Sequence, residues 1–301
     1  MSFENILNKV MEKIPYVRYA AIYRMNEKHR PGHYYSPVVN LKELALRKEA
    51  VWADKQLTGI DLNEAAQVSF LQEIIKWNAI IPFPEKAYHK YRYHFDNGWF
   101  PYADGIVLFA ILNHFKPARL IEVGSGFSSA LTLDTNEQFL DGSMELTFID
   151  PNPEDRLFAL LRGTDKNKCT VVKGIVQDTS VEVFKKLKAN DILLIDNSHV
   201  SKTGSDVNFI FTEVLPNLEK GVLIHVHDIF FPFEYPQDWL FEHRLNWNEL
   251  YMMHCFLLYN KAFEIIFFSD YIQTKYRDEL QEKIPGFMKS RPGSIWLRKV
   301  M

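Results

Sequence analysis

Two short stretches of the 301-residue chain place acids and histidines where they can act together. Asp196 and His199 stand three residues apart, directly after one apolar run, and His227 and Asp228 follow directly after another. Carboxylates and imidazoles in such positions bind a divalent metal, or accept a proton from a hydroxyl near neutral pH. These four residues are therefore the candidate reaction centre.

The pattern leaves three interpretations of this centre open. Asp196, His227 and Asp228 hold a divalent metal in the first. Mg²⁺ prefers oxygen ligands, whereas an imidazole suits Mn²⁺, Fe²⁺ or Zn²⁺ better. In the second interpretation no metal is bound, and His199 or His227 is the general base. In the third the histidines are structural, and their rings are satisfied by neighbouring carboxylates. We expect His225, which alternates with His227 along a strand, to be structural.

A glycine-containing turn forms the second candidate site. The run Glu122-Val123-Gly124-Ser125-Gly126 follows a short apolar stretch and precedes a helical one. Glycines let the backbone turn tightly and approach a ligand closely, and the helix after them offers unpaired N–H groups. A dinucleotide fingerprint would have a third glycine or alanine where Ser129 stands. Glu122 would repel a pyrophosphate but suits a cationic ligand.

The elements around these residues alternate between strand and helix. Apolar runs of about five residues predict strands, and the longer segments between them predict helices. This alternation indicates a parallel sheet with right-handed crossovers, in which ligands bind at the carboxyl ends of the strands. The expected strands are 119–123, 145–149, 170–172, 192–195, 222–226, 263–269 and 294–300. The expected helices are 104–114, 127–140, 154–162, 181–187 and 207–215.

At this point the chain resembles the class I S-adenosylmethionine-dependent methyltransferases. The run 119–127 is similar to their first motif, and Phe148-Ile149-Asp150 to their second. Ile195-Asp-Asn-Ser-His199, the loop 215–221 and His227-Asp228 resemble a bacterial subfamily with I-D-x-x-H and H-D motifs. Asn197-Ser198 and Glu219-Lys220-Gly221 depart from that subfamily's pattern. The resemblance implies a Rossmann-like, doubly wound, mostly parallel seven-stranded sheet with an antiparallel last strand.

The resemblance also implies roles for individual residues. Glu122 would hold the amine of the cofactor's methionine part, and the turn Gly124-Ser125-Gly126 would pass beneath that part and the ribose. Asp150 would accept hydrogen bonds from the ribose hydroxyls, which suits an acceptor-only carboxylate. Gln177 and Asp178 would lie near the adenine. For this last pair a solvated turn and a helix N-cap is an equally good explanation.

The first 95 residues have a different texture from the rest. They predict a helical cap with helices at 3–13, 41–56 and 63–78. This cap would serve in substrate binding or oligomerisation. A methyltransferase domain over 96–301 follows it. Two aromatic segments flank the alternating region, at 99–102 and 230–239. The second is the better candidate for substrate contact or a lid, because loops after parallel strands line the cleft. Ordinary packing explains it equally well.

Composition narrows the class of protein. The formal net charge is −3, which does not favour nucleic-acid binding, and the two cysteines are too few for a disulfide framework. The sequence shows neither a signal peptide nor a membrane span, which predicts a cytoplasmic protein. A homo-oligomer is compatible with all of this.

These observations favour an S-adenosylmethionine-dependent methyltransferase that acts on a hydroxyl of a small molecule or sugar. Two alternatives remain open at this stage. One is an NAD(P)-dependent oxidoreductase, against which Glu122 and the absent third glycine argue. The other is a non-catalytic protein of the same fold that binds the cofactor without forming S-adenosylhomocysteine.

Overall fold

The computed structural model describes residues 28–301, so the helix expected at 3–13 lies outside the described residues. Two compact units can be distinguished. The larger comprises Asp54–Pro236 and Trp247–Met301, and the smaller contains the described residues up to Ala53 together with Gln237–Asn246. The segment 54–95, expected to belong to a separate cap, lies within the larger unit. No helix in the described range is both long and apolar enough to cross a membrane.

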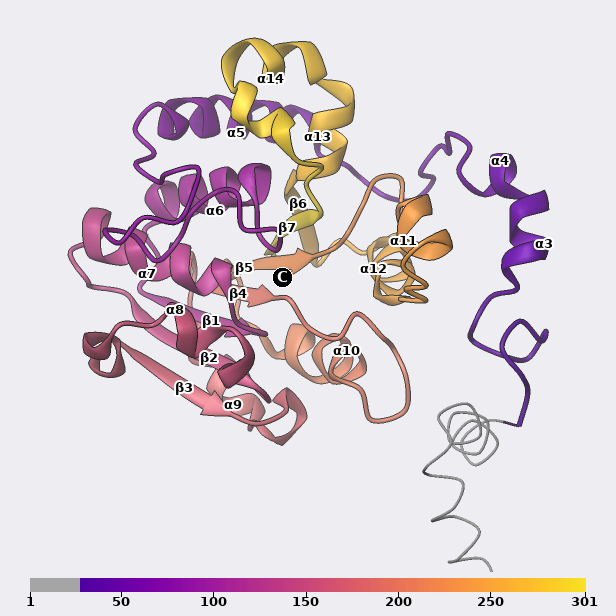
Figure 1. The fold of residues 1–301 in the computed structure, drawn as a ribbon, viewed down its shortest axis with the longest axis horizontal. Coiled ribbons are helices and arrows are strands. Elements are labelled where there is room, and N and C mark those ends of the chain that lie inside the picture. Colours follow the sequence, from indigo (N-terminus) through magenta and orange to yellow (C-terminus); the bar gives the residue numbers. More distant parts are fainter. Residues whose placement is uncertain (1–27) are drawn as a thin grey trace, which may run out of the picture. The chain divides into compact units, whose positions relative to one another are not determined.

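A seven-stranded sheet forms the centre of the larger unit, in the order β3-β2-β1-β4-β5-β7-β6 (Figure 1). The first five strands are parallel, and β7 runs antiparallel to both of its neighbours. This topology confirms the predicted fold class. The strands are β1 (Arg119–Val123), β2 (Glu145–Asp150), β3 (Cys169–Lys173), β4 (Ile192–Ile195), β5 (Leu223–His227), β6 (Phe263–Phe268) and β7 (Ser294–Lys299).

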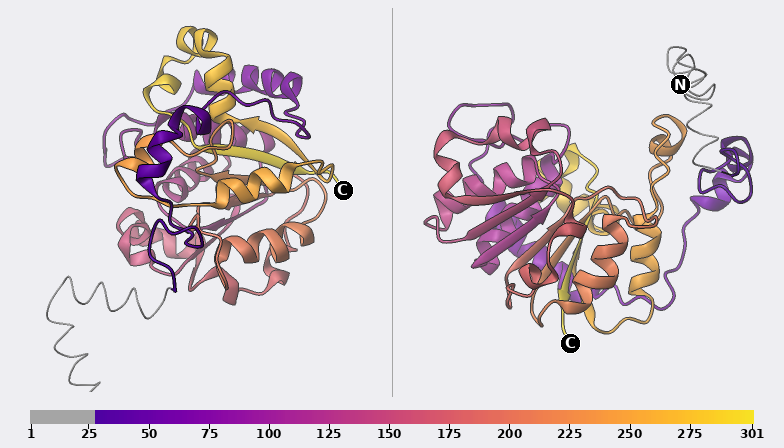
Figure 2. Two further views of the ribbon diagram at one scale, coloured as in Figure 1. Left: turned by 90° about the vertical axis from the view of Figure 1, so that its right-hand side faces the viewer. Right: turned by 90° about the horizontal axis from the view of Figure 1, so that it is seen from below.

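The central strands are apolar because helices cover both faces of the sheet (Figure 2). Every residue of β4 and of β5 is buried. The strand order reverses between β1 and β4, since β2 and β3 lie on one side of β1 while β5 lies beyond β4. Open α/β sheets bind ligands at the carboxyl edge beside such a reversal. That edge carries the residues after β1, β2, β4 and β5.

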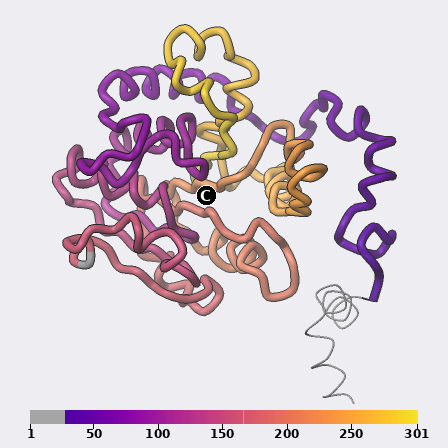
Figure 3. The backbone as a smooth tube through the Cα atoms, viewed as in Figure 1, coloured from indigo at the N-terminus to yellow at the C-terminus, as the bar shows by residue number. Residues whose placement is uncertain are grey.

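The helices of the larger unit differ in how deeply they are buried. α6 is buried over most of its surface and packs against α5 and α7. Figure 3 follows the last part of the chain, in yellow, from α13 and α14 back into the sheet as β7. The α-helices of this unit are α5 (Glu64–Asn78), α6 (Tyr102–Phe115), α7 (Phe127–Phe139), α8 (Leu157–Leu160), α9 (Val181–Phe184), α10 (Asp206–Phe209), α12 (Glu249–Leu257), α13 (Ser269–Lys275) and α14 (Arg277–Lys283).

Several helices are shorter than the sequence predicts. The region 154–162 forms a 3-10 turn, Pro153–Asp155, followed by α8. The region 207–215 changes from α10 to a π-helix, Ile210–Val214, and then to a 3-10 turn that contains Pro216, whose nitrogen has no hydrogen to donate. Further 3-10 turns are Gly163–Asn167, Val176–Asp178 and Pro285–Lys289.

α12 was not predicted from the sequence. Its buried residues are Glu249, Leu250, Met253 and Leu257, a helical spacing that is masked by other apolar side chains in the same segment.

Arg92 attaches the segment before α6 to the sheet domain. Its buried guanidinium donates five hydrogen bonds, which go to Asp134 on α7, to Glu137 on α7 and to Asp165. Asp134 also accepts the backbone N–H groups of Arg92 and Tyr93. A guanidinium with all five donors satisfied can remain buried, because its charge is paired as well as desolvated.

The smaller unit contains α3 (Leu41–Leu46), α4 (Lys48–Val51) and α11 (Gln237–Phe241). The side chain of Asn40 caps α3 by accepting from the N–H groups of Lys42 and Glu43. The single helix expected over 41–56 is interrupted at Arg47 and ends at Val51.

Candidate active site

The turn after β1 lies directly against the backbone that follows β4. Gly124 has a φ of +80°, and a Cβ atom at this position would lie 1.7 Å from the carbonyl oxygen of Asp196. The N–H of Asp196 donates to the carbonyl of Val123 at 2.8 Å. Only glycine satisfies both the dihedral angle and the contact. The predicted cofactor turn and the predicted reaction centre are therefore adjacent in space.

Glu122 lies beneath this turn and has no exposed surface. One carboxylate oxygen accepts from the hydroxyl of Ser128, and the other accepts from the hydroxyl of Ser129 at 2.6 Å. Burial raises the pKa of Glu122 to about 8, although both hydroxyls act in the opposite direction. The carboxylate thus supports the turn from within the protein, and its contact with a ligand amine stays a prediction.

Asp150 at the end of β2 is half-buried and holds the other side of the turn. One of its oxygens accepts from the N–H of Ser125 at 2.9 Å and from the hydroxyl of Ser125 at 2.6 Å. The other accepts from the N–H of Asn152 at 2.7 Å. A carboxylate has about four acceptor positions, so capacity for a ribose hydroxyl remains.

The two residues expected near the adenine differ in their surroundings. The Gln177 amide donates to the carbonyl of Gly204 at 2.8 Å, and its buried side-chain oxygen has no partner within residues 28–301. Asp178 is exposed. An unsatisfied buried acceptor is costly unless a ligand or water satisfies it. Gln177 is therefore the better candidate of the two for an adenine amino group.

The four candidate reaction residues converge at the ends of β4 and β5. His199 Nε2 lies 3.4 Å from a carboxylate oxygen of Asp196 and 3.3 Å from one of Asp228. His227 Nε2 lies 3.7 Å from the other oxygen of Asp228. The imidazoles of His199 and His227 are buried, whereas the carboxylates of Asp196 and Asp228 are 28% and 14% exposed. The acids therefore form the accessible face of the cluster.

Glu249 is a member of this cluster that sequence reasoning missed. It is fully buried on α12, and its carboxylate lies 2.9 Å from His199 Nδ1. Its second oxygen accepts from the side-chain amide of Asn197 at 3.1 Å, and Asn197 in turn accepts the N–H of His199. These bonds turn Nε2 of His199 toward the acids. The signal available in the sequence was a glutamate at the start of the otherwise mostly apolar segment 249–257. A glutamate that becomes buried there needs a partner.

Two residues of the cluster have backbone conformations in the left-handed region. His199 and Asp228 both have a φ of +57°. Non-glycine residues adopt this region at a cost, and such strain concentrates at functional sites. The hydrogen bonds that hold His199 over-determine its conformation. The loop after Asp228 is held by Asp270, which accepts from the N–H of Phe231 and is paired with Arg291.

The electrostatics of the cluster favour a positive charge beside its two acids. Burial lowers the pKa of His199, but Asp196 and Glu249 outweigh it and hold this pKa well above the usual value. Burial raises the pKa of Asp196, yet His227 and His199 bring it well below the usual value. The pKa of Asp228 is raised to about 6 by burial, which the histidines only partly offset. The acids therefore hold His199 in its protonated, positively charged form.

The neighbouring histidines differ from each other. The ring of His225 lies 5.5 Å from that of His227 in a stacked arrangement, so both are on the same side of β5 as predicted. Burial holds the pKa of His225 well below its usual value, with His227 acting in the same direction. His225 is therefore neutral, and both of its ring nitrogens are buried without a partner among residues 28–301, so its structural role stays a prediction.

The donor atoms fit a divalent ion. One ligand atom each from Asp196, His227 and Asp228 lies within 4.8 Å of the others, and these are the three ligands predicted from the sequence. Two oxygens and one imidazole nitrogen suit Mn²⁺ or Fe²⁺. The Nδ1 atom of His227 is buried without a partner among the described residues.

The aromatic loop after Asp228 packs into the protein more than the prediction of a lid requires. Phe230, Phe233 and Tyr235 are buried. The guanidinium of Arg291 covers the ring of Phe230 at 4.9 Å. These buried rings agree with the alternative of ordinary packing.

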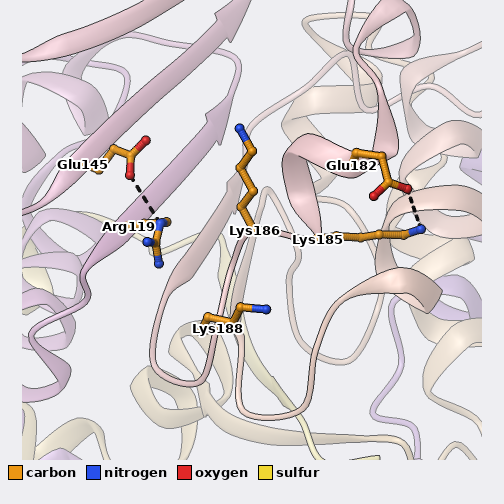
Figure 4. Close-up of a pocket in the computed structure, with 6 residues that line it drawn as sticks. All are labelled: Arg119, Glu145, Glu182, Lys185, Lys186 and Lys188. Atoms are coloured by element: carbon orange, nitrogen blue, oxygen red, sulfur yellow. Dashed lines mark hydrogen bonds and ion pairs between the residues drawn. The ribbon is translucent and has the colours of Figure 1, made fainter.

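A hollow on the opposite edge of the sheet is unrelated to this chemistry. It is lined by Arg119, Glu145, Glu182, Lys185, Lys186 and Lys188, at the beginnings of β1 and β2 and around α9 (Figure 4). Arg119 pairs there with Glu145, and Lys185 pairs with Glu182. Its charges are mostly paired within the chain.

Sequence comparison assigns the family. The family described as "Methyltransferase domain" matches residues 121–229, a range that runs from β1 to just beyond Asp228. The chain is also 32% identical over 196 residues to an uncharacterised protein of Archaeoglobus fulgidus, covering 63% of this chain and 87% of that protein. Residues 121–229 therefore contain a methyltransferase domain. The predicted enzyme class is thereby confirmed for this methyltransferase, and the oxidoreductase alternative is not favoured.

The solved structures that match the chain at low sequence identity include methyltransferases. A Podospora anserina methyltransferase with bound S-adenosylhomocysteine is 16% identical, covering 88% of this chain and 99% of that one, with a TM-score of 0.43. An O-methyltransferase from Bacillus cereus is 12% identical, covering 85% and 97%, with a TM-score of 0.42.

Proposed function

We propose that the protein transfers the methyl group of S-adenosylmethionine to a hydroxyl of a small molecule or sugar. The observation that carries this proposal is the contact of Gly124 with Asp196, which joins the turn after β1 to the acid and histidine cluster. A nucleoside bound over the turn thus has its reactive end beside Asp196, His199 and Asp228. No basic surface is needed for such an acceptor, in keeping with the net charge of −3.

The residues around the turn fit the cofactor. Asp150 retains acceptor capacity for the ribose, and the unpartnered oxygen of Gln177 suits an adenine amino group. The acids of the cluster favour a positive charge, as a sulfonium carries. S-Adenosylmethionine brings a methyl group that is already activated, so the protein has to align the acceptor and remove its proton.

His199 is the proposed general base, in the neutral form that it takes when a cation bound beside Asp196 and Asp228 lowers its raised pKa. Its Nδ1 atom is held by Glu249, so Nε2 is the nitrogen that faces the accessible acids. The acceptor oxygen forms a bond to the methyl carbon as the carbon–sulfur bond breaks, and the hydroxyl proton goes to Nε2. General-base assistance of this kind contributes about 10²–10⁴-fold to a rate.

Asp196, His227 and Asp228 would hold a divalent ion next to the same acceptor oxygen. Such an ion, when bound, lowers the pKa of a coordinated hydroxyl and so assists its deprotonation. In the alternative mechanism no metal is bound and His199 acts alone. Measuring activity after metal removal distinguishes the two mechanisms.

The proposed function is tested in two stages. Calorimetry with S-adenosylhomocysteine measures binding of the cofactor product, and a screen of hydroxylated small molecules and sugars measures formation of S-adenosylhomocysteine. Binding together with turnover supports the proposal. Binding without turnover on any acceptor supports the non-catalytic alternative, and binding of NADH with none of S-adenosylhomocysteine rejects the proposal.

A further inference from the structure

We infer that Arg156 binds the carboxylate of the amino-acid part of S-adenosylmethionine, with Trp99 holding its guanidinium over the glycine turn. The inference rests on the proposed function and adds a recognition residue to it. Arg156 lies between the 3-10 turn Pro153–Asp155 and α8, in a segment without any recognised motif.

The side chain of Arg156 lies directly on the turn. A Cβ atom added to Gly126 would be 2.7 Å from Cδ of Arg156 and 3.3 Å from its Nη1. Glycine at position 126 therefore leaves the space that this side chain uses. A guanidinium so placed is next to whatever ligand rests on the residues after β1.

Trp99 keeps the guanidinium in this position. The guanidinium carbon of Arg156 lies 3.8 Å from the centroid of the Trp99 ring, although the ring itself is 61% exposed. Stacking on an aromatic face uses the plane of a guanidinium and leaves the N–H groups along its edge available. Those groups match a carboxylate in a bidentate arrangement.

Arg156 differs from the other arginines near the sheet in having no acidic partner among residues 28–301. Arg92 is bound by three carboxylates, Arg291 is bound by Asp270, and Arg119 is paired with Glu145 and Asp191. A half-buried cation held in place without a counter-charge is ready to receive an anionic group.

The acids at this edge give such a cation a function in binding the cofactor. Asp150, Asp196 and Asp228 all lie at the carboxyl ends of the strands, where they suit the amine and the sulfonium but repel a carboxylate. The amino-acid part of the cofactor carries both kinds of charge. Arg156 is positioned to accept the negative one beside Gly126.

The test removes the charge from either partner. Calorimetry compares S-adenosylhomocysteine with its decarboxylated analogue, 5′-deoxy-5′-(3-aminopropylthio)adenosine, on the wild-type protein and on Arg156→Gln. We expect Arg156→Gln to weaken S-adenosylhomocysteine by about 10-fold to 100-fold, and to change the analogue by less than about 2-fold. Arg156→Lys, which keeps the charge without the fork, should lose less than Arg156→Gln.

Arg162→Gln is the matched control, because that guanidinium contacts the backbone carbonyl of Lys90 rather than the turn, and it should leave both ligands unchanged. Thermal unfolding of each variant shows whether it is folded. Equal weakening of both ligands by Arg156→Gln, or of neither, would overturn the inference. Failure of the wild-type protein to bind S-adenosylhomocysteine would instead reject the proposed function, and this inference with it.

Discussion

The Nδ1 atom of His199 lies 2.9 Å from the buried carboxylate of Glu249, fifty positions later in the chain. Glu249 has no exposed surface, and the same glutamate binds the Asn197 side chain. The pair therefore fixes one orientation of the imidazole, in which Nε2 is directed to Asp196 and Asp228.

Replacing either member of this pair tests its role. Once an acceptor has been found, His199→Gln should lower kcat by about 10²–10⁴-fold, as the loss of a general base does. Glu249→Gln should lower kcat by a smaller factor with little change in KM, because the imidazole remains but is less well oriented. The nitrogen-15 spectrum of the imidazole provides a second measurement, in which Glu249→Gln should shift the signals of His199. An unchanged spectrum and kcat would argue against the pair.

Metal dependence separates the two versions of the mechanism. Asp196, His227 and Asp228 should bind Mn²⁺ with one site per chain, measured by calorimetry on chelator-treated protein. Asp228→Asn should remove this binding, because it takes away one of the two charged ligands of the set. Chelation should also suppress turnover, and Mn²⁺ should restore it. Full activity of the metal-free protein would leave His199 as the sole means of deprotonation.

Asp150→Ala should abolish measurable binding of S-adenosylhomocysteine by calorimetry, a loss of at least about 100-fold. The substitution removes two functions of the carboxylate. It is the proposed acceptor for the ribose hydroxyls, and it accepts the hydrogen bonds that hold Ser125 in the turn. Asp155→Ala is the control, because Asp155 is exposed in the next turn of the same segment. Unchanged affinity in the Asp150 variant would refute its assignment.

Glu122 makes stability depend on pH. Its pKa rises from 4.5 to about 8 on folding, so the folded state binds a proton more tightly than the unfolded state does. The free energy of unfolding should therefore fall as pH rises from about 4.5 to 8, by at most roughly 4 to 5 kcal/mol for this group.

Glu122→Gln mimics the protonated form and should flatten this dependence. We expect it to resemble the wild type near pH 5 and to be the more stable protein near pH 8.5, as measured by urea unfolding. If the free energy of unfolding of the two proteins had the same pH dependence, folding would not raise the pKa of Glu122.

Arg92 should matter for stability more than any exposed ion pair. Arg92→Ala leaves the buried carboxylates of Asp134 and Asp165 without their counter-charge and should cost about 3–5 kcal/mol in the free energy of unfolding. Arg298→Ala breaks a partly exposed pair with Glu264 at 3.5 Å and should cost less than about 1 kcal/mol. Similar losses in the two variants would contradict the role of Arg92 as an anchor.

The sequence by itself determined the sheet and which residues lie together at its carboxyl edge. Strands β1 and β4 begin and end where their apolar runs predict, because hydrophobic strands between turn residues are a local signal. In a parallel sheet the residues after successive strands share one edge, so the set of Asp196, His227 and Asp228 was predictable without coordinates.

The tertiary structure decided which partner each of these residues has. Glu249 reaches His199 from a helix that local patterns did not indicate, and Glu122 proved to be enclosed by two serines. Arg156 lies on Gly126 beside Trp99, although these three residues are spread over 58 positions between 99 and 156. Contacts of this kind depend on how helices and loops pack over the sheet, and the periodicity of a single segment carries no information about them.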